Sequence, residues 1–168
     1  MVQERVQAKK KWTIRRFLSE DFDKHGFDAR PLEGESPAES VVEGNVLLNE
    51  GITEMIDLLI GDSAAAYSEA NAQIGVGDGT SGESAAHTGL VGAQKTYKAM
   101  ESGYPTNASQ KATFRSIFAS GEANYDWQEF TVANTSGEVG DNLNRKQSNQ
   151  GTKAAGQTWT IDLEITFS

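Results

Sequence analysis

The chain has no cysteine among its 168 residues, so it can form neither a disulfide framework nor a thiolate metal site. It also lacks any run of 18 apolar residues, and charges occupy the amino terminus where a signal peptide would need an apolar stretch. These absences predict a soluble chain that has no obvious export signal and no membrane partner.

Motifs that carry chemistry are scarce as well. The only two histidines, His25 and His87, have no identifiable orienting acid or reacting partner in their sequence neighbourhoods. Residues 77–82 match G-x-G-x-x-G, but a dinucleotide site also needs a helix at the third glycine and a parallel βαβ unit. Because more glycines follow instead, we interpret residues 78–92 as a flexible loop. We therefore predict a non-enzymatic protein without catalytic residues, cofactor or metal ion.

Basic residues are few and unevenly placed. Lys and Arg number 15 against 24 Asp and Glu, which gives a net charge of -9. Residues 1–16 hold six basic residues and one acidic residue, a local charge of +5, so the remainder carries -14. A basic end on an acidic body predicts contact with an acidic protein surface, such as that of a sister subunit. A solvated tail is the alternative, and nucleic acid is not expected because phosphate would repel the acidic body.

Residues 1–44 are predicted to form an extended N-terminal arm. Aromatic residues are scattered among its charges, and the proline-flanked stretch 31–37 suits no regular element. Trp12 and Ile14 alternate with polar residues, a pattern that suits a strand added to the sheet edge of a neighbouring subunit. The predicted partner-binding residues are Lys9, Lys10, Lys11, Trp12, Arg15, Arg16, Phe17, Phe22 and Phe27.

Residues 45–168 are predicted to form one domain, and they begin with a helix over residues 49–61. Asn49 can cap its start and Gly61 its end. Apolar residues recur there at helical spacing, and a helix this short needs packing, so we expect the apolar stripe to lie on a sheet. The stripe consists of Ile52, Met55, Ile56, Leu59 and Ile60.

The rest of this domain alternates with the period of β-strands. Strand patterns occur at residues 72–77, 95–100, 111–119 and 127–133. The longest covers residues 158–168, where every second residue from Trp159 is apolar, so we expect one buried face. The expected fold class is mainly β: an antiparallel β-sandwich or flattened barrel with one packed α-helix and an extended N-terminal arm.

Carboxylates and aromatic residues gather at residues 122–129, a combination typical of sugar-binding and glycosidase sites. Tyr125 and Trp127 could stack on a sugar ring. Asp126 and Glu129, however, lie three apart at a strand start and should point to opposite faces, which disfavours catalysis. The favoured interpretation is a structural corner between two strands, with passive glycan binding as the alternative.

The run from Phe114 to Asn134 resembles a pattern in uncharacterised structural proteins of tailed phages and prophages. In that family a strand ending in Phe leads to Glu-Ala-Asn, then Trp-x-Glu, then an aromatic residue and an Asn. Further landmarks follow the family's order at residues 45–51, 74–78, 103–105 and 143–146 and in the terminal Trp-Thr-Ile strand. The resemblance spans residues 45–168, and the segment 1–44 is the part that it covers least. It implies a virion protein with no enzymatic motif.

These observations together predict a non-enzymatic virion structural protein, made in the host cytoplasm and placed on the particle exterior. The favoured role is a capsid decoration, or cement, protein that binds the major capsid protein or other virion proteins through its arm. A tail, baseplate or fibre component is the first alternative and a glycan-binding module the second. We also expect a homo-oligomer, for which a trimer would suit capsid threefold positions.

Overall fold

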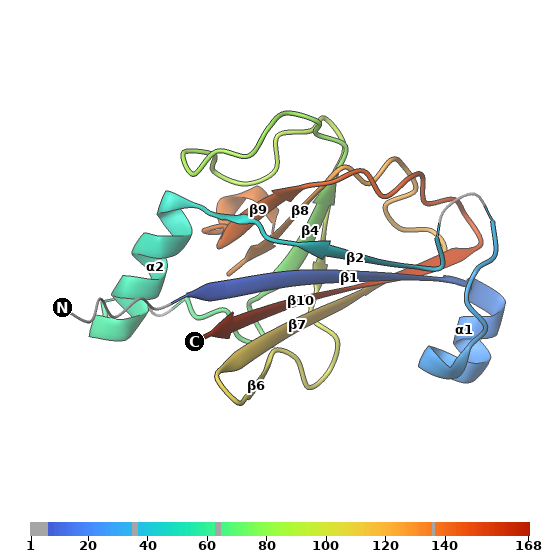
Figure 1. Ribbon diagram of the computed structural model, residues 1–168, viewed down its shortest axis with the longest axis horizontal. Helices are drawn as coiled ribbons and strands as arrows, with labels where there is room; N and C mark the ends of the chain where they lie inside the picture. Colours follow the sequence, from blue (N-terminus) through green and yellow to red (C-terminus); the bar gives the residue numbers. More distant parts are fainter. Residues whose placement is uncertain (1–6, 35–36, 63–64, 136) are drawn as a thin grey trace.

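The computed structural model describes residues 7–34, 37–62, 65–135 and 137–168. They form two antiparallel five-stranded sheets, with strand orders β2-β1-β10-β7-β6 and β3-β9-β8-β4-β5 (Figure 1), which confirms the predicted mainly β fold. The strands are β1 (Ala8–Leu18), β2 (Glu39–Glu43), β3 (Val46–Leu47), β4 (Gln73–Gly77), β5 (Lys95–Ala99), β6 (Thr106–Ala108), β7 (Lys111–Phe118), β8 (Glu129–Ala133), β9 (Asn144–Gln147) and β10 (Gln157–Phe167). Two α-helices, α1 (Ser19–His25) and α2 (Asn49–Ile60), and two short 3-10 helices, η1 (Gly26–Asp28) and η2 (Gly137–Val139), connect them.

One hydrophobic core lies between the two sheets. Trp12 and Ile161 enter it from the first sheet, and Ile74 and Phe130 enter it from the second. The rings of Trp12 and Phe130 lie 5.7 Å apart between centroids, so they join the inner faces directly. This is the arrangement of a β-sandwich, and the described strands form no closed barrel.

The predicted N-terminal arm is wrong for residues 8–18, because they form β1 inside the chain's own sheet. β1 lies between β2 and β10, and all eleven of its residues pair with β10, from Ala8 opposite Phe167 to Leu18 opposite Gln157. The alternation at Trp12 and Ile14 did mark a strand, but its partner is the C-terminal strand of the same chain. The domain therefore includes residues on both sides of the predicted boundary at residue 44.

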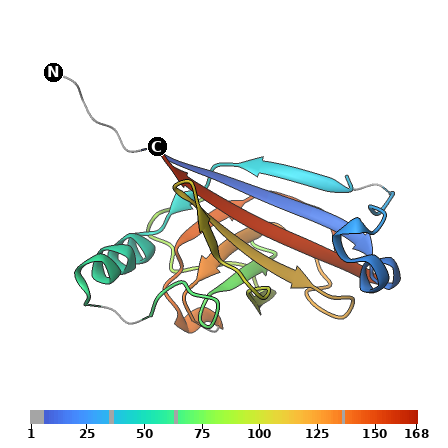
Figure 2. The ribbon, with the colours of Figure 1, turned by 90° about the horizontal axis from the view of Figure 1, so that it is seen from below.

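The segment after β1 covers one end of the sandwich. The rings of Phe17, Phe22 and Phe27 form a small aromatic cluster, with centroids 5.0 to 6.3 Å apart. α1 thus folds back beside β1 and β10, and in Figure 2 it lies at the end of the molecule opposite to α2. Two of the predicted partner-binding aromatics, Phe22 and Phe27, belong to this cluster.

Helix α2 has nearly the predicted bounds, but the face that packs against the core is not the predicted apolar stripe. Gly61 ends it in the left-handed conformation as expected, whereas its N-cap position is Leu48 and not Asn49. The predicted stripe does not lie on a sheet: Ile52, Ile56, Leu59 and Ile60 are 38%, 52%, 85% and 68% exposed, and only Met55 packs against the core. The reason is Gly51, since a β-carbon there would lie 2.5 Å from Leu143 Cα, and so the glycine side of the helix faces inward.

Candidate functional site

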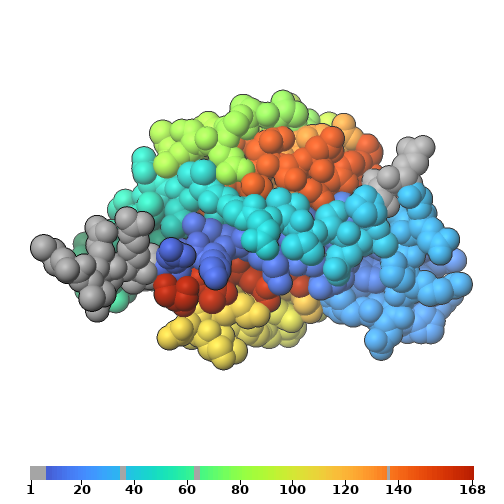
Figure 3. All heavy atoms as spheres, viewed as in Figure 1, coloured from blue at the N-terminus to red at the C-terminus, as the bar shows by residue number. Residues whose placement is uncertain are grey.

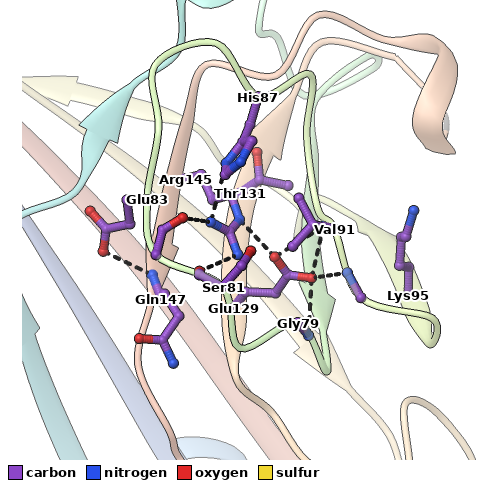
Figure 4. A network of polar contacts seen from close by, with 12 residues as sticks. Gly79, Ser81, Glu83, His87, Val91, Lys95, Glu129, Thr131, Arg145 and Gln147 are labelled. Carbon is purple, nitrogen blue, oxygen red and sulfur yellow. Dashed lines mark hydrogen bonds and ion pairs between the residues drawn. The ribbon is translucent and has the colours of Figure 1, made fainter.

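A buried ion pair between Glu129 of β8 and Arg145 of β9 forms the densest polar network of the described residues (Figure 4). Both side chains are fully buried, and Arg145 Nε lies 2.7 Å from Glu129 Oε2. The Glu129 carboxylate also accepts hydrogen bonds from the backbone N–H groups of Gly79, Val91 and Gly92, at 2.7 to 3.2 Å. The pair thereby holds both ends of the segment from residue 78 to residue 92.

Arg145 holds the middle of the same segment. Its two terminal nitrogens donate to the carbonyl oxygens of Ser81 and Gly82, both at 3.1 Å, and one lies 3.3 Å from His87 Nδ1. The segment that we interpreted as a flexible loop is therefore anchored at its ends and at its centre. Buried ions need this degree of hydrogen bonding to offset their lost hydration. Both members of the pair are fully engaged, so we assign the network a structural task.

Two glycines of the G-x-G-x-x-G match, Gly77 and Gly79, also have a structural explanation. A β-carbon on Gly79 would collide with the Glu129 carboxylate, and one on Gly77 would lie 2.7 Å from Glu129 Oε1. Both glycines let the backbone approach Glu129 closely, and Gly79 donates its N–H to the carboxylate. Strand β4, which precedes them, is followed by antiparallel β5 and not by the helix of a dinucleotide site.

The acidic and aromatic residues at 122–129 form a corner of the fold. Trp127 is fully buried, lies 4.9 Å from both Phe118 and Trp159 between ring centroids, and donates its Nε1–H to Ala123 O. Tyr125 donates its hydroxyl to Val76 O at 2.9 Å, and burial raises its pKa to about 12. Trp127 therefore has no exposed ring to stack on a sugar, and Tyr125 is half-buried with its hydroxyl engaged. This geometry fits the interpretation as a structural corner, and glycan binding stays an untested alternative.

A buried lysine fastens this corner to the C-terminal half of the chain. Lys153 Nζ donates to Ala119 O at 2.7 Å and to Asn124 Oδ1 at 2.9 Å, and the residue has no exposed surface. Burial lowers the pKa of its ammonium group to about 8, although Glu122 nearby favours the charged form. Both oxygens that accept from Lys153 belong to the corner itself, so we assign this lysine a structural role as well.

Several predicted partner-binding residues serve the chain's own core. Trp12, Arg16 and Phe17 are at most 3% exposed, so they are not available to grip a neighbour. The Arg16 guanidinium lies 4.5 Å from the centre of the Trp159 ring and donates to Pro37 O and Gln150 O at 2.7 and 3.0 Å. Burial lowers the pKa of Arg16 to about 10.

The other predicted residues lie on the outer face or at the start of β1. Arg15 pairs with Glu39 and with Asp162, and Lys11 lies 2.6 Å from Glu164. Lys9 is exposed and Lys10 half-buried, and no ion pair within the described residues involves either one. Partner binding stays a prediction for these two lysines, for Lys11 and Arg15, and for the half-buried Phe22 and the 42% exposed Phe27.

The outward face of α2 is the surface that sequence reasoning assigned to the core. Its four exposed aliphatic residues follow one another at helical spacing and form one stripe, which we call the α2 face: Ile52, Ile56, Leu59 and Ile60. Single exposed apolar residues are ordinary, but a contiguous group of large ones typically marks an interaction site. Gly51 was the signal in the sequence for this orientation, because a glycine at that position lets the helix backbone lie against the Leu143 backbone.

Neither known protein families nor curated proteins nor solved structures gave a match to this chain. In the described ranges no group of three or more His, Asp or Glu side chains is placed to hold a metal ion. The helices found there are all too short or too polar to cross a membrane.

A hollow of about 500 Å³ between α1 and residues 30–33 is lined by Asp21, Lys24 and Arg30, among others. Asp21 accepts the backbone N–H of Arg30 there, a local structural bond.

Proposed function

We propose that this chain is a non-enzymatic structural protein of a tailed-phage particle, and that it decorates the outside of the capsid by binding the major capsid protein. The observation that carries the proposal is the exposed α2 face. A large aliphatic side chain gains about 1.5–3 kcal/mol when it passes from full exposure to full burial. A helix that presents four such residues to solvent is therefore suited to docking on another protein.

The surroundings of the buried charged residues support a non-catalytic role. Glu129, Arg145 and Lys153 are the most deeply buried charged groups beside Arg16, and their hydrogen bonds are made to the chain's own backbone and side chains. A catalytic acid or base needs an open position for a substrate, whereas these groups are surrounded by fixed partners. We therefore give these groups no chemical role in the proposal, in which the protein acts through surface contacts.

The family resemblance is compatible with this proposal. Trp127, Glu129 and Arg145, which belong to its landmarks, are core or anchor residues of the fold. A likeness carried by such residues favours a shared architecture over a shared active site. The proposal changes the means of attachment, because the α2 face and the exposed start of β1 replace the predicted arm.

Gold-labelled antibody on intact particles tests the proposal. We expect label on the heads of particles from the strain that encodes this chain; label on tails would instead assign it to the tail, baseplate or fibre. Unlabelled particles would refute a virion role. The double variant Leu59→Ser with Ile60→Ser should enter particles poorly, while the matched control Val139→Ser, which changes an exposed residue outside α2, should enter normally.

A further inference from the structure

The end of the molecule that carries α2 also carries a group of basic residues. β1 begins and β10 ends there, as both ribbon views show, and Figure 3 displays the two strand ends on the surface near α2. We call this group the lysine end: Lys9, Lys10, Lys11 and Lys111. Phe167, which is 41% exposed, lies beside it at the end of β10, on the face of the sheet that it shares with Lys10.

The lysine end has unmatched positive charge. Glu164 accepts contacts from both Lys11 and Lys111 at 2.6 Å, and this pairing by two ammonium groups lowers the pKa of its carboxyl. Glu43 also borders this surface. Four lysines therefore meet two glutamates, and Lys9 and Lys10 have no ion-pair partner in the described part of the chain. Lys9, Lys11 and Lys111 lie on one face of the sheet, and Lys10 and Phe167 on the other, so both faces of this strand end carry positive charge.

The α2 face has the opposite character. Asp57 lies in the last turns of α2, and Asp62 follows the C-cap residue Gly61; the last turn of the helix contains no basic residue. The helix dipole adds partial negative charge at this same end, where proteins usually place Lys or Arg. The sequence has no Lys or Arg between Arg30 and Lys95, so residues adjacent in the chain supply no cation either.

We infer that the α2 face of one copy packs on the lysine end of a second copy in a twofold dimer. The two surfaces are complementary in charge, and the exposed aliphatic residues of the α2 face have one exposed aromatic ring, Phe167, as an apolar contact beside the lysine end. Because they lie at the same end of the molecule, one twofold axis brings each α2 face against the lysine end of the other protomer. Direct packing of α2 on α2 would instead offer Asp57 and Asp62 no cation, because α2 itself contains no Lys or Arg.

This inference goes beyond the proposed function: it names a second copy as what covers the α2 face and the lysine end of the free protein before the chain docks on the capsid. Sedimentation equilibrium of the full chain, from about 5 to about 200 µM, should show a monomer–dimer equilibrium. The dimer should weaken between about 50 mM and about 500 mM salt, because the Debye length shortens over this range. Leu59→Ser with Ile60→Ser should raise the dissociation constant at least about tenfold, while Val139→Ser leaves it unchanged.

Charge reversal supplies the decisive comparison. Lys9→Glu with Lys10→Glu, or Asp57→Lys with Asp62→Lys, should each raise the dissociation constant about tenfold or more, and all four together should restore it to within about threefold. Melting curves check folding, and the single exposed variants Lys9→Glu and Asp62→Lys repeat the test if a pair fails to fold.

Two results would overturn the inference. One is a monomer at all concentrations; the other is a dimer whose dissociation constant rises on changing Leu59 and Ile60 but stays unchanged in both charge-reversal variants. The second would mean that α2 meets another surface. A monomer that nevertheless labels particle heads would refute only the twofold dimer. A dimer whose particles carry no label would refute only the virion role.

Discussion

Glu129→Gln should destabilise the protein strongly although it preserves the size of the side chain. Arg145 would keep its charge at zero exposure and lose its only buried counter-ion, a change that typically costs about 3–5 kcal/mol. The new amide also brings an N–H₂ group into a site where Glu129 now accepts from Arg145 Nε and from three backbone N–H groups. At least one donor would lose its acceptor, which by itself costs about 1–3 kcal/mol.

Urea unfolding and thermal melting measure this effect. For a chain of this size, a loss of about 3–5 kcal/mol lowers the melting temperature by roughly 6–20 °C. Hydrogen exchange adds a local readout, since the amides of Gly79, Val91 and Gly92 should lose protection before the strands do. A loss below about 1 kcal/mol, with these amides still protected, would contradict the assignment of Glu129 as the anchor of residues 78–92.

Two further variants make the comparison specific. Glu138→Gln is the matched control, because Glu138 pairs with Lys95 at a side chain that is 61% exposed, and such a pair is worth at most about 1 kcal/mol. The double variant Glu129→Met with Arg145→Met should be more stable than the sum of the two single losses predicts, because it leaves no unpaired ion.

Three other changes test the fold. Deleting residues 1–30 should abolish folding, because it removes β1 from between β2 and β10; circular dichroism of the purified product checks this. Gly51→Ala should lower the unfolding free energy by about 1–3 kcal/mol in urea despite alanine's higher helix propensity, because its β-carbon would collide with the Leu143 backbone. From pH 8 to pH 10 the wild type should gain about 1–3 kcal/mol relative to Lys153→Met, because only the folded chain has released the Lys153 proton.

The sequence pattern identified most long elements but not all their partners. The alternation from Trp159 predicted β10, and residues 95–100 and 111–119 predicted β5 and β7 within about one residue of their ends. An alternating pattern states which side chains share a face, but it carries no information on which strand lies alongside. The alternation at Trp12 and Ile14 therefore predicted a strand on a neighbour's sheet edge, although β10, as long as the observed β1, is present in the same chain.

The buried ion pair could not be found from local pattern. Glu129 and Arg145 lie 16 residues apart, and each is a charged residue in a strand where a solvent-facing position is the ordinary expectation. The 78–92 segment covers the outer face of β8 and buries them, so that even Thr131, which should face solvent, has no exposed surface. Loop cover of this kind is a tertiary effect that strand periodicity does not contain.

Gly51 shows how the error at α2 could have been avoided. An apolar stripe indicates that a helix face is to be covered, but not whether its own chain or another protein covers it. A glycine inside a helix costs about 1 kcal/mol relative to alanine, so its presence indicates close approach on the side where it lies. Gly51 faces away from the stripe of Ile52, Ile56 and Leu59, and its side of the helix is the one that meets Leu143. When the glycine and the apolar stripe of a short helix disagree, the glycine marks the intramolecular contact and the stripe becomes the candidate interface.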